Sequence, residues 1–235
     1  MTLKAIIFGS IGTVTETSDM QRRAFNRAFA EADLNWDWDF ETYKDMVAGD
    51  GAIVGGSDRI AAYAAARGEA LSTETIDRLH TAKSANFQKL MADKRLTPNA
   101  GVVDLIADAR ANGLKIAFAS TTSPENIAAM FAATAPSLTA AHFDLVLSGD
   151  DVTAIKPAPD IYLRALERLG VAAVEAIAIE DTATSMAAPL AAHIPTVIVP
   201  GMIARSQDFG QTPVVHSLGT VAALEAAAHH REPVS

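Results

Sequence analysis

The chain has 235 residues, of which 49% are hydrophobic and 20% charged, a composition typical of a globular protein and not of a disordered one. Its formal net charge of −9 argues against non-specific binding to nucleic acid or to an anionic membrane. Cysteine is absent, which excludes disulfides, cysteine nucleophiles and thiolate metal sites. With no signal-peptide pattern and no apolar run long enough to span a bilayer, we expect a cytoplasmic protein without a membrane or nucleic-acid partner.

Five short apolar runs are predicted to be β-strands. They are mostly continuous rather than alternating, which is typical of strands buried on both faces of a sheet. The runs are residues Lys4–Phe8, Lys115–Ala119, Asp144–Ser148, Ala176–Ile179 and Thr196–Val199. Helical patterns lie between the later strands, over Gly101–Asn112, Pro124–Ala133, Pro159–Leu169 and Thr184–Ala192. This alternation predicts an α/β protein with a doubly wound parallel sheet.

Several residues are typical of helix ends. Asn99 ahead of Val102 and the pair Ser123-Pro124 are expected to start helices, and glycines at 113 and 170 to end them. Pro189 falls where a helix interior is expected, so that helix should start late or kink.

The interval between the first and second strands is too long for one crossover. It has helical patterns, such as Arg22–Ala32 and Ile60–Arg67, but no convincing strand. We therefore expect a helical cap domain over residues 16–92, with residues 1–15 and 93–235 forming the core. The tail His229–Ser235 is expected to fray, and its histidine pair is interpreted as incidental rather than as a metal site.

Four segments with polar side chains are expected to meet beyond the carboxyl ends of the strands, where open α/β sheets bind ligands. The backbone at Gly12-Thr13, the Ser120 hydroxyl and the Lys156 ammonium are candidates to bind phosphoryl oxygens. Glu180 and Asp181 offer oxygen ligands suited to Mg²⁺. The alternatives are an exposed surface lysine for Lys156 and a helix-capping pair for the two acids.

In this order, the four segments resemble the motifs of the haloacid dehalogenase (HAD) superfamily of phosphohydrolases. Its members end their first strand in Asp-x-Asp-Gly-Thr, whereas this chain has Gly9-Ser-Ile-Gly-Thr13. The resemblance implies a HAD-like core in which the first aspartate would be the nucleophile and a metal ligand, and the second the general acid and base. Gly9 and Ile11 stand at those two positions, so we expect impaired catalysis and weakened Mg²⁺ binding.

The region after the first strand narrows the resemblance to CbbY-type sugar-phosphate phosphatases. It is carried by Glu16–Ala32, Asn35–Trp38 and Gly55–Ile60. The resemblance makes Arg23 and Arg59 candidates to contact substrate from the cap, although both can equally be solvated helix charges. Departures from the family pattern occur at Gln21, Ser57, Ser185 and His193.

Ser10 is disfavoured as a substitute nucleophile, because alternate residues of an extended segment point in opposite directions. Three functions stay open. The leading hypothesis is a catalytically impaired protein that binds a phosphorylated sugar, another small phosphorylated metabolite or an inorganic anion. The alternatives are a weak or altered Mg²⁺-dependent hydrolase that uses Glu16 or Asp181, and a non-catalytic interaction scaffold.

Overall fold

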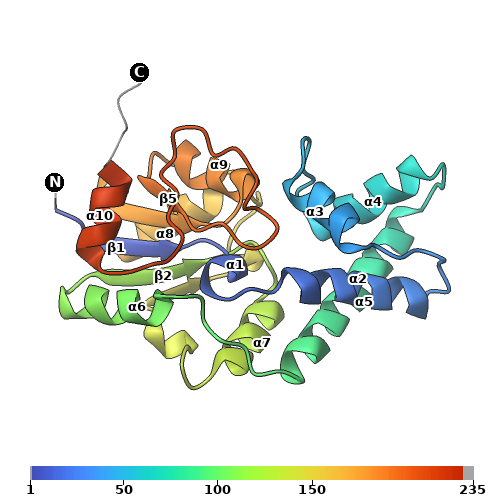
Figure 1. Cartoon of the computed structure of the whole chain (residues 1–235), viewed down its shortest axis with the longest axis horizontal. Helices are drawn as coiled ribbons and strands as arrows, with labels where there is room; N and C mark the ends of the chain where they lie inside the picture. Colours follow the sequence, from blue (N-terminus) through green and yellow to red (C-terminus); the bar gives the residue numbers. More distant parts are fainter. Residues whose placement is uncertain (1, 230–235) are drawn as a thin grey trace.

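A five-stranded parallel sheet lies at the centre of the larger part of the chain (Figure 1). The computed structural model describes residues 2–229. The strand order is β3-β2-β1-β4-β5. The strands are β1 (Ala5–Phe8), β2 (Lys115–Ala119), β3 (Leu145–Leu147), β4 (Ala176–Glu180) and β5 (Thr196–Ile198). The predicted doubly wound parallel sheet is confirmed, and the observed strands differ from the predicted runs by a single residue at some ends.

Helices cover both faces of this sheet. One face packs against α6 (Val102–Ala111), α7 (Pro124–Thr134) and α10 (Val221–His229), and the other against α8 (Asp160–Leu169) and α9 (Ala183–Ala191). Along β1, Ile6 and Phe8 join the first hydrophobic cluster, while Ala5 and Ile7 join the second. Because both faces are buried, the strand sequence is continuously apolar. Short 3-10 turns at Ala140–His142, Gly149–Asp151 and Ala173–Glu175 complete the connections.

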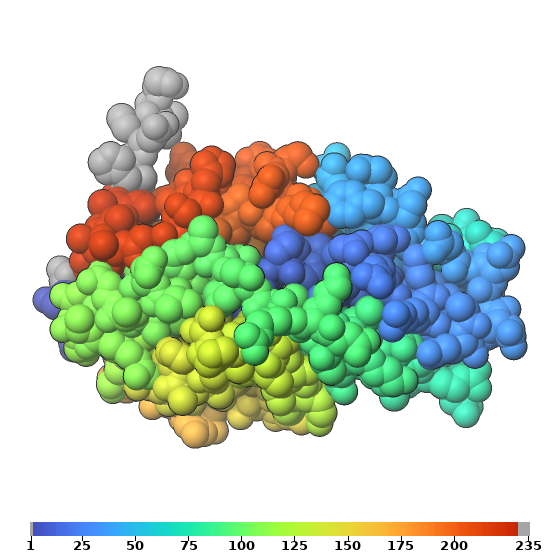
Figure 2. All heavy atoms as spheres, turned by 60° about the horizontal axis from the view of Figure 1, so that its bottom comes forward, coloured from blue at the N-terminus to red at the C-terminus, as the bar shows by residue number. Residues whose placement is uncertain are grey.

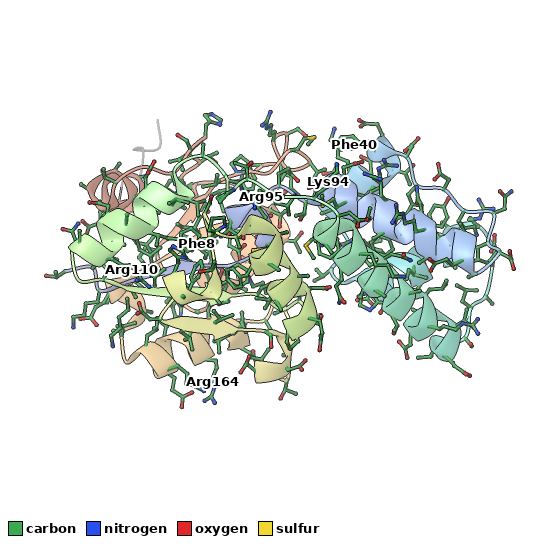
Figure 3. All side chains as sticks on the ribbon, turned by 90° about the horizontal axis from the view of Figure 1, so that it is seen from below. Phe8, Phe40, Lys94, Arg95, Arg110 and Arg164 are labelled. Atoms are coloured by element: carbon green, nitrogen blue, oxygen red, sulfur yellow. The ribbon has the colours of Figure 1, made fainter. Side chains whose placement is uncertain are left out.

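The strand register explains why the polar segments meet. Phe8 is paired with Phe118 on β2 and with Ile179 on β4. The residues that follow these three therefore come level at the carboxyl edge of the sheet, with Gly9 beside Glu180. Phe8 lies among the helices near the centre of Figure 3, whereas Arg164 lies at the periphery.

The helix-end predictions have mixed outcomes. Ser123 caps α7 as predicted, because its side chain accepts a hydrogen bond from the Asn126 N–H, and Gly170 ends α8 in the left-handed conformation. The prediction for Asn99 is wrong: its side chain donates to the Gly12 carbonyl oxygen at 2.8 Å, and Gly101 occupies the N-cap of α6. A late start of α9 is also wrong, since the helix begins at Ala183 and contains Pro189.

Four helices follow the first strand and the short helix α1 (Ile11–Val14). They are α2 (Ser18–Glu31), α3 (Phe40–Ala48), α4 (Gly56–Ala66) and α5 (Thr73–Ala92). All residues from 16 to 92 are described, and none lies in a strand. The helices share a hydrophobic cluster of their own that includes Phe25, Phe29 and Trp38. Figure 1 shows this helical insertion at the opposite end of the molecule from α10.

The helical insertion is tied to the sheet-bearing part at several points. Its helix α5 packs against α7, and the two parts meet along a continuous surface in Figure 2. Glu16 accepts hydrogen bonds from the N–H groups of Ser18 and Met202, both at 2.7 Å. The chain returns from the insertion through Lys94 and Arg95, which are labelled in Figure 3. Among the described residues, the structure has no helix with the length and apolar character needed to cross a membrane.

Candidate functional site

Two adjoining cavities of about 240 and 440 Å³ lie between the carboxyl edge of the sheet and the helical insertion. Both are bordered by Ser10, Ser120 and Asp181 from the sheet side and by Arg59 from the insertion. We call these two cavities together the site cavity. A larger hollow of about 660 Å³ lies between α3 and residues 206–208, but none of the candidate site residues lines it. The predicted meeting point of the polar segments is therefore a hollow in the folded chain.

Lys156 lies at the floor of the smaller cavity and is buried, so it is not an exposed surface lysine. Its Nζ donates hydrogen bonds to the Gly9 carbonyl oxygen and, at 2.6 Å, to Glu180 Oε1. Ser120 is also buried. Its hydroxyl oxygen accepts a long hydrogen bond of 3.4 Å from the Thr122 N–H. A positive charge and a hydroxyl that can still donate therefore border one small hollow.

Tyr162 and Glu180 fill the space beside Gly9. The Tyr162 hydroxyl donates to Glu180 Oε1 at 2.5 Å, and the Glu180 side chain is fully buried. Burial, followed by the negative charge of Glu180, raises the pKa of Tyr162 well above its usual value. A Cβ atom placed on Gly9 would lie 2.0 Å from the Tyr162 hydroxyl oxygen and 2.2 Å from Glu180 Oε1. Any side chain at position 9 would therefore have to displace these two groups.

Asp181 lies on the cavity wall, next to Gly12. The surrounding protein desolvates its carboxyl group and, together with nearby Glu180, raises the pKa of Asp181 to about 6, although a hydrogen bond with Ser10 opposes the shift. The Ser185 hydroxyl donates to Asp181 Oδ1 at 3.3 Å. A Cβ on Gly12 would lie 1.8 Å from Asp181 Oδ2, so only glycine permits this close approach.

The donor set of this site does not fit Mg²⁺ in the observed arrangement. Gly9 and Ile11 supply no side-chain oxygen, and Glu180 directs Oε1 to Lys156 and Tyr162. Within residues 2–229, no three acidic or histidine side chains gather in a way that could hold a metal ion. Hard divalent cations need several oxygen ligands, more than these side chains offer.

The turn after β1 differs from its prediction in two respects. The Thr13 N–H, predicted to bind phosphate, instead contacts Ser10 Oγ at 3.2 Å and the Ser10 carbonyl oxygen at 3.3 Å. Ser10 does border the site cavity along with Gly9, contrary to the alternation argument; it is still extended and is the N-cap residue of α1, which begins at Ile11. The structure thus removes one predicted donor, Thr13, and adds one hydroxyl, Ser10.

On the insertion side, Arg59 borders both cavities, and its buried Nε has no hydrogen-bond partner. Arg23 is not among the residues that border either cavity in the described chain. Sequence reasoning missed His80 and Lys83 on α5, which line the larger cavity. Burial, followed by the charge of Lys83, lowers the pKa of His80. The site cavity is therefore bordered by a cationic side chain on each side, Lys156 and Arg59.

Lys83 is 7% exposed and has no carboxylate partner among the described ion pairs. Its Nζ donates to Gln21 Oε1 and lies 4.8 Å from the ring centre of Phe25 and 5.2 Å from that of Phe87. Burial, followed by the charge of Arg59, lowers the pKa of Lys83 to about 7. Helical spacing from Leu79 and Phe87 could have indicated that Lys83 lies on the buried face of α5.

Comparisons with known proteins agree with this fold. A family profile described as haloacid dehalogenase-like hydrolase matches residues 3–193. The chain is 37% identical over 209 residues to Protein CbbY of Rhodobacter capsulatus, a match that covers 89% of this chain and 90% of that protein. It is 35% identical over 207 residues to Protein CbbY of Cereibacter sphaeroides, covering 88% of each chain.

Solved structures of CbbY have the same fold as this chain. A crystal structure of CbbY from Rhodobacter sphaeroides in complex with phosphate superimposes with a TM-score of 0.86 at 34% sequence identity. The match covers 95% of this chain and 100% of that one. A mutant of that protein, in complex with xylulose-(1,5)bisphosphate, also gives a TM-score of 0.86 and covers 95% of this chain and 99% of the other.

Proposed function

Because this chain belongs to the haloacid dehalogenase-like hydrolase family, we propose that it binds a phosphorylated sugar or a similar anion and turns it over slowly or not at all. One observation carries the proposal: the Lys156 ammonium and the Ser120 hydroxyl border the cavity, while position 9 beside them has no carboxylate. A pocket with donors and no nucleophile favours binding over cleavage.

The two sides of the site cavity suggest how a ligand would lie. We propose that its phosphoryl group contacts Ser120 and Lys156, and that its far end faces Arg59 and Lys83 on the helical insertion. Two CbbY structures, one with phosphate and one with a sugar bisphosphate, support a ligand of this class. In this proposal residues 16–92 act as a cap that closes over the ligand, and Arg23 takes no part.

Impaired catalysis follows from what positions 9 and 11 lack. Without a nucleophilic carboxylate and an acid–base group, phosphate esters should be hydrolysed at least ~10⁴-fold more slowly than by family members that have both. Glu16 and Asp181, the two acids that a residual hydrolase would use, do not replace the missing nucleophile and acid–base group. Glu16 is held by two backbone N–H groups, and Asp181 contacts Ser185. These contacts favour binding without turnover.

The protein is further proposed to act in the cytoplasm on a small phosphorylated metabolite, without a nucleic-acid or membrane partner. Its net charge of −9 supports the absence of a nucleic-acid or anionic-membrane partner. The phosphoryl end of the cavity should not need Mg²⁺, because Ser120 and Lys156 offer donors there and positions 9 and 11 carry no carboxylate that would repel the phosphoryl group.

A phosphate-ester panel tests the proposal. Purified protein is screened by thermal shift and by phosphate release, with and without Mg²⁺. We expect Mg²⁺-independent binding, worth about 2.7 kcal/mol of stability at a ligand concentration ~100 times the dissociation constant. Lys156→Ala should abolish binding, and the exposed control Lys89→Ala should not.

Phosphate release at ordinary phosphatase rates that depends on Mg²⁺ and is lost in Asp181→Ala would overturn the proposal and favour the hydrolase alternative. Absence of both binding and turnover would favour a scaffold.

A further inference from the structure

We propose that Lys83 is a reactive amine that forms an imine with the carbonyl group of a phosphorylated aldehyde or ketone bound in the site cavity. The proposal rests on the phosphate site described above and adds to it a ligand class and a covalent step. It starts from the position of Lys83, which lines the 440 Å³ cavity together with Ser120 and Asp181.

The surroundings of Lys83 favour the neutral amine. The ammonium form would be buried among Phe25, Phe87 and the Gln21 amide, with no carboxylate to compensate for lost hydration. The other charged groups around it are Arg59 on α4 and His80 on the same helix, with Asp58 and Asp77 nearer His80. Repulsion from Arg59 acts in the same direction as burial, which agrees with the lowered pKa of Lys83. An amine that is unprotonated near neutral pH can act as a nucleophile.

The site cavity could hold the phosphoryl group of a ligand at one end and place the reactive amine of Lys83 at the other. Ser120 lines both cavities and Lys156 the smaller one, so a phosphoryl group held there would project the rest of the molecule toward α5. Lys83 and Gln21 line the 440 Å³ cavity, whereas Lys156 lines only the adjoining 240 Å³ cavity. Holding an electrophile beside a nucleophile converts a bimolecular reaction into one within a complex and raises its rate. An anchored carbonyl compound should therefore react with Lys83 before it reacts with a surface lysine.

The chemistry needs no oxidant and no metal. The lone pair of the Lys83 nitrogen attacks the carbonyl carbon, a C–N bond forms, and the amine proton moves to the former carbonyl oxygen. The C–O bond of the resulting carbinolamine then breaks, and its hydroxyl group leaves as water together with the second amine proton, so that a C=N bond to Lys83 remains. Hydrolysis reverses the sequence, so the adduct is lost unless the C=N bond is reduced.

Pyridoxal 5′-phosphate, an aldehyde with a phosphate group, is a suitable probe. The full-length protein is incubated with a small excess of it at neutral pH, treated with borohydride to reduce the imine, and analysed by intact mass and peptide mapping. We expect one label per chain at Lys83 rather than at any of the other six lysines. Labelling should be at least about tenfold slower with pyridoxal, which lacks the phosphate, and inorganic phosphate should compete.

Lys83→Met should lose the label, while Lys89→Met, an exposed lysine on the same helix, should keep it. The map of the wild-type protein identifies the labelled lysine even if Lys83→Met folds poorly. Labels spread over surface lysines, or equal rates with pyridoxal and its phosphate, would overturn the inference.

A parallel thermal-shift titration separates this inference from the proposed function. Glycerol 3-phosphate has no carbonyl group, so it reports the phosphate site alone. Lys156-dependent binding of glycerol 3-phosphate without any label at Lys83 would reject the imine and leave the phosphate site intact. Lack of such binding, together with a Lys83 label that is indifferent to Lys156→Ala, would reject phosphate anchoring and with it both proposals.

Discussion

Gly9 shows how one residue determines the packing of the candidate site. With no side chain at this position, the Tyr162 hydroxyl and the Glu180 carboxylate occupy the space beside its Cα atom, and Lys156 binds both Glu180 and the Gly9 carbonyl oxygen. These groups belong to segments that are about 150 residues or more from Gly9 in the sequence. Replacing Gly9 alone therefore does not rebuild an active site, because the space for the new carboxylate is taken.

The first prediction follows from that packing. Gly9→Asp with Ile11→Asp should introduce weak Mg²⁺ binding and some phosphatase activity, limited by the Tyr162 and Glu180 side chains that the new carboxylate must displace, whereas either change alone should do little because the two groups act as a unit. Adding Tyr162→Phe should raise the activity further, since it removes the hydroxyl oxygen that would lie 2.0 Å from the new Cβ. The measurement is hydrolysis of a small activated phosphate ester against Mg²⁺ concentration.

Tyr162→Phe in the wild-type background is the matched control and should remain inactive. If the folded triple variant binds Mg²⁺ and still cleaves no ester, the defect extends beyond the first motif, toward Ser185, Pro189 and His193.

Lys83 gives a second prediction, on pH and stability. Its folded-state pKa of about 7 lies below the ordinary value of 10.5, so between these pH values the unfolded chain binds more protons than the folded one. The free energy of unfolding of the wild type should therefore rise with pH over this range, relative to Lys83→Met, by an amount on the order of a few kcal/mol. Urea titrations of both proteins from pH 6 to about 10 test this, and a constant difference between them would contradict it.

At the scale of elements, the start of α6 depends on a glycine. Gly101 has a φ of 79°, and a Cβ at this position would lie 1.7 Å from the carbonyl oxygen of Leu218. That oxygen belongs to the backbone of the segment that leads to α10, whose residues Val221 and Leu224 pack in the same hydrophobic cluster as α6. The close approach therefore fixes how the last helix is joined to the sheet.

The third prediction is that Gly101→Ala destabilises the fold by about 2–4 kcal/mol. The left-handed conformation costs a residue with a Cβ roughly 1–2 kcal/mol, and the backbone clash with Leu218 adds to it. Gly113→Ala is the control, because Gly113 has a similar φ of 72° but no atom within 4 Å of the added Cβ. Urea denaturation of both variants measures the difference, and equal losses of stability would show that the contact with Leu218 is relieved at no cost.

At the scale of the whole molecule, Gln207 links the helical insertion to the sheet. Its Nε2 donates to the Ala48 carbonyl oxygen at the end of α3, and its Oε1 accepts from the Ala183 N–H at the start of α9, both at 3.0 Å. Ala183 lies two residues after Asp181, which lines the site cavity. One side chain thus joins the insertion to the element that carries part of the site.

The fourth prediction is that Gln207→Ala loosens this junction while changing the free energy of unfolding by only about 1–2 kcal/mol. Amide hydrogen exchange should become faster at Ala183 and around residues 48–52. Gln207→Glu keeps an acceptor for Ala183 but removes the donor to Ala48, so it should loosen the α3 side and spare Ala183. Unchanged exchange in Gln207→Ala would show that the junction is held by other contacts, such as α5 on α7.

The sequence by itself determined the architecture and only part of the membership of the site. Continuous apolar runs mark strands buried on both faces, and glycine or serine at their ends marks several helix boundaries correctly. Since the carboxyl ends of parallel strands meet at one edge, Ser120, Lys156 and Asp181 could be predicted to lie together.

Only the tertiary structure decided what those residues contact. Ser10 borders the cavity as the extended N-cap residue of α1, and the Thr13 N–H donates to the Ser10 side chain. Glu180 contacts Lys156 and Tyr162 because Gly9 leaves room for these side chains. Lys83 has Gln21 as its hydrogen-bond partner, and no carboxylate among the described residues, because of the helices that pack against α5. Backbone pattern is a local property that can be read along the chain. The partner of a buried polar group depends on atoms brought together by packing between distant segments.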